Sequence, residues 1–330
     1  MYKNPLFVII LVSSLFFSCK KNAEHENLKP SAKGEANTVV VVISGPNWDS
    51  EAGDAIRSRF SELVTGLPQE EPTFDILFVP HANFDKVYKR QRNIFLTQIG
   101  PDYKENFLVS YSPWAKPQIV VTVTAPNQEA FVKYFTTIQD KVVGLISDFE
   151  RERLMSSYSS GKDAPLCKKI LNKHQIDINI PEGYKVATDS TDVIWLTNEY
   201  RDIIESIVIY SYPYTDSNTF SKNYLISKKN QIESKYIRGE IYGSFVTTED
   251  RFPVEMNEFS YNGKYTVELK GLWRMEKGVA MGGPFISITQ YDEKRQRIVT
   301  AEGFIFAPAH EKRNLVRRVE AVIYSMKFPE

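Results

Sequence analysis

The amino-acid sequence predicts an α+β protein made of an N-terminal α/β layer domain and a C-terminal antiparallel sheet flanked by helices. Three observations lead to this fold class. The β-branched run at 38–45 is typical of a strand buried on both faces. Apolar residues at 131–149 recur three and four apart, as on one face of a long helix. From residue 184 onward, strand patterns outnumber helical ones.

In the first part, a helix is expected directly after the strand at 38–45, with Asp49 or Ser50 as its cap and Gly66 beyond its end. The apolar face of this helix is Ile56, Phe60, Leu63 and Val64. Further strands are predicted at 74–79, 93–99, 107–111 and 119–124, and a short helix at 82–90. The long helix begins after Asn127, which can cap it. Its apolar residues are Phe131, Phe135, Ile138, Val142, Leu145 and Phe149.

The boundary between the two parts is predicted near residue 160. The segment 156–166 reads SSYSSGKDAPL, and such a cluster of serine, glycine and proline is typical of a loop. We therefore expect an N-terminal domain at 38–160 and a C-terminal, β-rich domain at 161–330.

The second part is expected to contain seven strands and two helices. Strands are predicted at 184–188, 193–197, 207–212, 243–247, 259–273, 285–291 and 298–306, and helices at 217–236 and 315–326. The apolar side of the first of these helices is predicted from Phe220, Tyr224, Leu225, Ile232 and Tyr236. The order βββ-α-ββββ-α resembles the PsbP-like fold. A likeness in element order implies a fold and no activity.

The N-terminus resembles the signal of a bacterial lipoprotein. Residues 6–17 are apolar apart from two serines, and this run is too short to span a membrane but has the length of a signal-peptide core. Ser18 precedes Cys19. The resemblance implies that residues 1–18 are removed and that Cys19 is acylated, with palmitate for example, which would hold the protein on a membrane. Lys20 favours the outer membrane.

Residues 19–37 are predicted to be the lipidated cysteine and a flexible tether. The segment is polar and charged, and Pro30 and Gly34 interrupt it. The folded part would then stand away from the bilayer.

The overall composition argues against several classes of function. The chain has 41 lysines and arginines against 41 aspartates and glutamates, so no basic excess favours nucleic acid. Four histidines and two cysteines, none at metal-ligand spacing, argue against a zinc site. No phosphate-binding or dinucleotide-binding glycine motif is present, and no cofactor is predicted.

Two features of the second part are candidates for binding. The segment 275–284 combines Met275 and Met281 with Gly282 and Gly283, and methionine surfaces adapt to partners. A plain hairpin loop is the alternative. Tyr210, Tyr212 and Tyr214 alternate along one strand and therefore share a face. With Trp273 they are candidate ligand-facing aromatics, and packing of the sheet face is the alternative.

Candidates for catalysis are weaker. The strand-to-helix turn at 44–49 and His81 could form a dispersed hydrolase site if the fold brought them together. Cys167 is expected to be unreactive, because His174 is near it only in sequence. Glu70 and Glu71 are adjacent on an extended segment and should point in opposite directions, which argues against a shared acid–base role.

Several short stretches together resemble a family of uncharacterised bacterial lipoproteins catalogued as a domain of unknown function (4837). They are Trp48 with 53–54, 67–74, 92–94, 114–118, 271–273 and 282–285. The resemblance covers nearly the whole chain after the signal. It implies a location in the cell envelope and carries no functional residues with it.

The function predicted from these observations is a lipid-anchored protein of the cell envelope, most simply a non-enzymatic module that binds or assembles with an envelope protein. The alternatives are an envelope hydrolase with a dispersed site and a small-ligand carrier with a cavity beside Tyr210 and Trp273. The sequence favours a non-enzymatic role without deciding the question.

Overall fold

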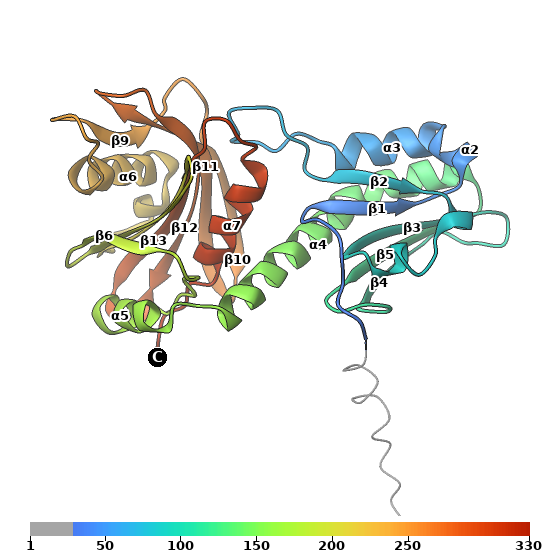
Figure 1. Cartoon of the computed structure of the whole chain (residues 1–330), viewed down its shortest axis with the longest axis horizontal. Helices are drawn as coiled ribbons and strands as arrows, with labels where there is room; N and C mark the ends of the chain where they lie inside the picture. Colours follow the sequence, from blue (N-terminus) through green and yellow to red (C-terminus); the bar gives the residue numbers. More distant parts are fainter. Residues whose placement is uncertain (1–28) are drawn as a thin grey trace, which may run out of the picture.

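The computed structural model describes residues 29–330, and it consists of two sheets joined by one long helix (Figure 1). Residues 1–28, which include the predicted signal and Cys19, lie outside the described part. The first sheet has five strands in the order β2-β1-β3-β5-β4. They are β1 (Thr38–Val42), β2 (Asp75–Val79), β3 (Asn93–Ile99), β4 (Asn106–Tyr111) and β5 (Ile119–Ala125). All neighbours are parallel except β4 and β5.

Strand β1 is buried on both faces, as its uninterrupted apolar run predicts. Val39 and Val41 belong to the core beneath helices α3 (Glu51–Phe60) and α4 (Gln128–Ser160). Val40 and Val42 belong to a smaller core on the opposite face, which loops cover with Phe84, Tyr88 and Trp114. The first part is therefore an α/β layer with its helices on one face.

The helix after β1 differs from its predicted extent. A short helix, α2 (Gly45–Trp48), precedes α3, and Ser50 caps α3 by accepting from the amide of Ala52. Helix α3 ends at Phe60, so Leu63 lies outside it, pairs with Pro72 and is half exposed. The helix predicted at 82–90 is wrong as well. Two single-turn 3₁₀ segments, η1 (His81–Asn83) and η2 (Tyr88–Arg90), replace it.

The end of the predicted tether is bound to the first sheet domain. Ala32 donates its amide to Lys116, and Lys33 donates to Arg90 and accepts from Arg92. Residues 30–33 thus lie along the loops that follow η2 and β4. The prediction of a flexible tether as far as residue 37 is wrong for this stretch, because backbone hydrogen bonds fix it without any apolar pattern.

Helix α4 belongs to both parts of the chain, and it runs between the two sheets in Figure 1. Asn127 caps it, as predicted. Its first turns carry Phe131 and Phe135 into the first core, whereas Met155 and Tyr158 pack against the second. The predicted loop at 156–166 is wrong, because α4 continues to Ser160 and α5 (Ala164–His174) follows almost directly.

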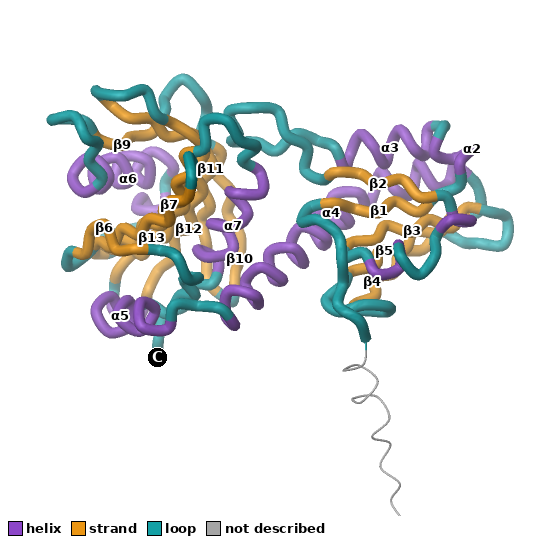
Figure 2. Tube along the Cα trace, in the orientation of Figure 1, coloured by secondary structure: helices purple, strands orange, loops and turns teal. Residues whose placement is uncertain are grey.

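The second sheet has eight strands and is antiparallel throughout. Its strands are drawn in orange in Figure 2, with α5, α6 and α7 in purple around them. Its order is β10-β11-β12-β13-β8-β7-β6, and β9 also pairs with β11. The strands are β6 (Lys185–Asp189), β7 (Val193–Tyr200), β8 (Ile203–Pro213), β9 (Phe245–Thr248), β10 (Glu255–Tyr261), β11 (Lys264–Glu276), β12 (Gly282–Asp292) and β13 (Arg297–Phe306). The single strand predicted at 259–273 is in fact a hairpin, which turns at Asn262 and Gly263, both with positive φ.

Helices cover both faces of this sheet. Helix α7 (Arg313–Tyr324) and α5 pack on one face over a core that includes Ala301 and Ile305 of β13. Helix α6 (Lys222–Tyr236) packs on the other face, over a core that includes Phe304 of the same strand. The predicted class, an α/β layer domain followed by an antiparallel sheet flanked by helices, is confirmed. No helix within residues 29–330 is long and apolar enough to cross a membrane.

Candidate functional site

A pocket of about 330 Å³ opens on the α6 side of the second sheet. Its floor is made by the sheet itself, with Trp195 and Thr197 from β7, Ile204 and Ser206 from β8, Trp273 from β11, and Phe304 and Phe306 from β13. These strands are spread over residues 193–306, and the folded sheet brings their side chains together at one site. The floor is mainly aromatic and aliphatic, which is typical of a pocket that takes an apolar group.

The orientation of Trp273 is fixed by its neighbours. The indole Nε1–H donates a 3.0 Å hydrogen bond to the backbone oxygen of Ile305. The ring of Phe304 meets the indole edge-on with centroids 5.2 Å apart. Trp195 is held in a similar way, since its Nε1–H donates to Ser206 Oγ at 3.3 Å. Both tryptophans have satisfied polar atoms and present apolar surface to the pocket.

One wall is the hairpin between β11 and β12, the segment singled out in the sequence. The amide of Met275 donates to the backbone oxygen of Met281 at 2.8 Å, so the loop between these residues is closed at its base. Met275, Val279 and Met281 all line the pocket. Methionine side chains can adjust to differently shaped ligands.

The two glycines of that hairpin do not line the pocket but let its strand approach the sheet. A Cβ on Gly283 would lie 2.0 Å from the backbone oxygen of Ile305, and a Cβ on Gly282 would lie 2.8 Å from that of Trp273. These positions therefore require glycine for packing. Met275 and Met281 thus line the pocket, and Gly282 and Gly283 allow their strands to pack closely.

The opposite wall is the segment between α6 and β9, residues 237–246. Ile237, Ile241 and Val246 give it an apolar surface, and Ser244 Oγ–H closes its turn on the backbone oxygen of Ile241 at 2.6 Å. Exposed apolar side chains stand around the mouth. Ile241 and Val279 line the pocket and are 50% and 60% exposed, and Tyr242, which follows Ile241 in the sequence, is fully exposed. The charged groups of the mouth, Glu199, Arg238 and Glu240, are also exposed.

Tyr210 and Tyr212 lie on the same face of the sheet but do not line this pocket. Tyr210 is buried and stacks on Tyr212 with centroids 6.4 Å apart. Tyr212 in turn meets Tyr224 of α6 and the ammonium group of Lys228. Burial raises the pKa of both phenols. The structure thus places these two tyrosines in the packing beneath α6, and Trp273 alone of the predicted aromatics in the pocket.

Helix α6 also buries a charged cluster that sequence reasoning missed. Lys229 Nζ lies 2.6 Å from Glu233 Oε2 and 3.3 Å from Glu302 Oε1, and all three side chains are at most 1% exposed. Burial, followed by the nearby Glu233 carboxylate, raises the pKa of Glu302 well above its usual range. The buried site thus favours the protonated form of Glu302. Lys229 and Glu233 look like an exposed i,i+4 pair in the sequence, so no sequence signal separated them from a solvated helix face.

Comparison with family models identifies the second part of the chain. Residues 163–325 match the model described as a domain of unknown function (DUF4837). This part of the chain is a DUF4837 domain. Residues 32–159 match a different model, described as a domain of unknown function (DUF8532), so the resemblance to the first family does not extend over the first part. The DUF4837 domain contains the whole pocket.

Two solved structures match part of this chain. One is a mutant of the protein Mog1, at 13% identity and a TM-score of 0.29, covering 45% of this chain and 84% of that one. The other is the Saccharomyces cerevisiae Ran-binding protein Mog1p, at 10% identity and a TM-score of 0.30, covering 47% and 90%. These TM-scores are too low to support a conclusion, so the PsbP-like resemblance stays a prediction. No curated protein matches the chain.

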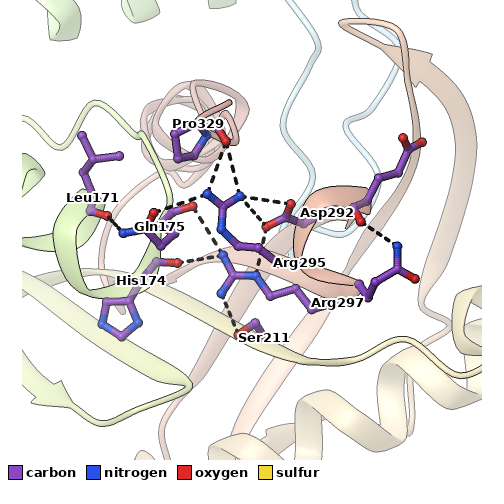
Figure 3. Close-up of polar contacts among 10 residues, drawn as sticks. Leu171, His174, Gln175, Ser211, Asp292, Arg295, Arg297 and Pro329 are labelled. Carbon is purple, nitrogen blue, oxygen red and sulfur yellow. Dashed lines mark hydrogen bonds and ion pairs between the residues drawn. The ribbon is translucent and has the colours of Figure 1, made fainter.

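The DUF4837 domain fastens α5 to its sheet through a polar cluster at the β12–β13 turn (Figure 3). Buried Asp292 accepts from both Arg295 and Arg297. Arg297 also donates to the backbone oxygen of His174 at 2.8 Å, and Arg295 donates to that of Pro329. The cluster joins the end of α5, the turn and the C-terminus.

Cys167 of the DUF4837 domain is buried, and its sulfur accepts a hydrogen bond. The amide of Ile180 donates to its Sγ at 3.3 Å, and burial raises the pKa of the thiol. His174 is bound through its ring to Asp189 Oδ1 at 3.0 Å, so its partner is a carboxylate on β6. The expectation that Cys167 is a structural residue agrees with these contacts.

The residues of the dispersed hydrolase hypothesis have separate partners. Ser44 accepts from the amide of Asn47 at the start of α2, and His81 Nε2 contacts the backbone oxygen of Thr97 at 2.6 Å. Neither lines the pocket described above. Glu71 points away from Glu70, as expected of adjacent residues. It is buried and accepts the amides of Lys312 and Arg313 at 2.7 and 2.8 Å, whereas Glu70 is exposed.

Proposed function

We propose that this protein is a lipid-anchored, non-enzymatic binding module of the cell envelope, and that its DUF4837 domain receives an apolar side chain of an envelope protein. The observation that carries the proposal is the pocket between the methionine hairpin and the segment 237–246. It is mainly apolar inside, and its volume of about 330 Å³ suits one or two side chains of a partner.

The mouth of the pocket favours a protein partner over a small ligand. Ile241 and Val279 expose apolar surface at the opening, and the neighbouring Tyr242 is fully exposed. Exposed apolar side chains that lie together on a surface mark sites where proteins bind. Tyrosine and methionine are enriched where proteins bind one another. Glu199, Glu240 and Arg238 supply a charged rim that could fix the orientation of the partner. A small-ligand carrier is the second candidate, because the pocket lies beside Trp273.

Photocrosslinking in cells tests the partner. A photoreactive amino acid is placed at Val279 in the full-length, membrane-anchored chain, and a matched one at Leu108, which is 56% exposed on the first domain. We expect the Val279 probe, and not the Leu108 probe, to capture one envelope protein through an apolar residue. The Met281→Glu variant should abolish this adduct, because it places a carboxylate in the apolar wall.

Equal capture from both positions, or no adduct at Val279, would overturn the protein-partner proposal. The second candidate function, a small-ligand carrier, is tested by native mass spectrometry of the purified chain. A small apolar molecule retained by the wild-type protein and lost in Met281→Glu would support the carrier.

The anchor is tested separately, by labelling cells with an alkyne analogue of palmitate. Label on the wild-type chain should be retained in Cys167→Ala and lost in Cys19→Ala. Label that persists in Cys19→Ala would show that this cysteine is not the acylated residue, and the lipoprotein proposal would be wrong.

A further inference from the structure

A second cavity, of about 190 Å³, lies where the two parts of the chain meet. Residues 64–67 enclose it from the first domain, Ser147 and Arg151 from α4, and residues of α7 together with Lys270 of β11 from the second domain. Gly66 packs against Lys270, since a Cβ built on the glycine would lie 3.4 Å from the lysine Cβ. The cavity is thus a product of the domain junction, and it is separate from the pocket of the proposed function.

The lining of this cavity is rich in cations. Arg151, Lys270, Arg313 and Arg317 face it together with a single carboxylate, Glu320. A small cavity with four cationic side chains is costly unless their charges are compensated. The arrangement therefore raises the question of what compensates each one.

Three of the four cations have carboxylate partners that fix them in place. Arg151 binds Glu320 at 3.2 Å as well as Asp148, so the one carboxylate of the lining is already taken. Lys270 Nζ lies 2.8 Å from Glu268. A separate carboxylate, Asp75, holds Arg313 at 2.7 Å. These side chains are held rigidly around the cavity.

Arg317 is different, because it makes no ion pair and no hydrogen bond with any residue in the range 29–330. Its guanidinium group lies 5.6 Å from the centre of the Phe74 ring, which supports one side of it. Burial lowers the pKa of Arg317, Glu320 opposes this, and Arg313 and Arg151 lower the pKa further. An arginine keeps its charge in proteins. The five N–H donors of Arg317 therefore lie at the cavity with no hydrogen-bond acceptor among residues 29–330.

We propose that this cavity binds a phosphate-type oxyanion, either free phosphate or the phosphate group of a monoester. The planar guanidinium of Arg317 can donate two parallel hydrogen bonds to such a group. Lys270 adds a point charge, and the Ser147 hydroxyl adds a neutral donor. The volume of about 190 Å³ admits the anionic group and excludes most of a larger ligand such as a nucleotide. An anion bound here also joins the two domains, because its ligands come from both the α4 segment and α7.

Isothermal titration calorimetry of the purified full-length chain tests this site with inorganic phosphate, at an ionic strength held constant with sodium chloride. Arg317→Gln is expected to weaken binding at least tenfold. The control Arg251→Gln makes the same change of charge at an arginine whose side chain is 77% exposed, and it should bind as the wild type does. Ser147→Ala keeps every charge and should weaken phosphate binding several-fold. It is the alternative test variant if Arg317→Gln folds poorly.

Two further titrations identify the source of the anion. Glycerol 3-phosphate represents a small ester, and vesicles containing phosphatidic acid represent a lipid headgroup. Binding of any of the three probes that is lost in Arg317→Gln and kept in Arg251→Gln supports the site and names its source. The proposal is overturned if none of the probes binds, or if Arg317→Gln binds them as tightly as the wild type. The outcome is independent of the crosslinking experiment, since the two cavities share no residue.

Discussion

Lys229 and Glu233 form an ion pair with a 2.6 Å separation, one turn apart on α6, and both side chains are removed from solvent. The pair stands on the sheet face next to Glu302 and above the ring of Phe285, which lies 4.3 Å from the ammonium group. Taking charges out of water is expensive, and only mutual attraction with good geometry offsets the cost. The cluster is therefore a place where a single substitution should have a large effect.

Lys229→Met is expected to lower the free energy of unfolding by about 3–5 kcal/mol, because it leaves the Glu233 carboxylate buried without a cation. Urea denaturation measures the effect. Lys235→Met on the exposed side of the same helix is the control, with an expected change within about 0.5 kcal/mol. Combining Lys229→Met with Glu233→Leu and Glu302→Leu should restore most of the stability, since no charge is then buried. A single variant as stable as the wild type would contradict this account.

The same cluster predicts how stability depends on pH. Glu302 has a folded-state pKa raised well above its unfolded value of about 4.3, so between these two values the folded state holds a proton that the unfolded state has lost. Its contribution to stability is therefore complete at low pH and is lost as the pH rises through the folded-state pKa. Glu302→Gln removes this titration. Unfolding free energies measured from pH 4 to 8 should fall more steeply in the wild type than in the variant, and parallel curves would show that Glu302 is ionised in the folded protein.

Glu71 links the two parts of the chain by capping α7, whose own N-cap residue, Lys312, offers no side-chain cap. Its carboxylate satisfies two amides at the positive end of the helix. Glu71→Ala is expected to cost about 2 kcal/mol, because both amides lose a charged acceptor. Chemical denaturation followed by tryptophan fluorescence measures the loss. Glu70→Ala, at the exposed neighbouring position, should change stability little, and an equal loss in both variants would rule out the cap as the cause.

Local sequence patterns were enough to predict those helices and strands whose formation is determined by residues close together in the chain. The β-branched run of β1, the spacing of Phe131 and Phe135 in α4, and the cap at Asn127 all act within a few residues. The region around α5 carries local helix signals, although its serine, glycine and proline residues predict a loop. Asp163 accepts from the amide of Leu166, and a proline occupies the first turn, which together mark the start of a helix.

The site was predictable only in part, because its walls meet through tertiary packing. Trp273, Met275 and Met281 were singled out by residue type, and the fold brings them into one pocket. The segment 237–246 that faces them has no strong pattern of its own. The burial of Lys229 depends on Glu302, which is contributed by a distant strand, and no local pattern reports such a partner.

Close packing between β13 and α7 gives a final prediction, which rests on Gly303. A Cβ at this position would lie 2.5 Å from the Cβ of Val319, closer than real contacts allow, so Gly303→Ala must displace the helix from the sheet. We expect a loss of about 1–3 kcal/mol, as for other overpacked cores. Gly144→Ala is the matched control, because it lies within α4 and its added Cβ meets no atom within 4 Å other than the nearby backbone of its own helix. That substitution should raise stability by about 0.5–1 kcal/mol, since alanine is the better helix former. Thermal denaturation of both variants separates the two effects. If Gly303→Ala were as stable as the wild type, α7 would be free to move on the sheet, and the contact at Val319 would not constrain the packing of the helix.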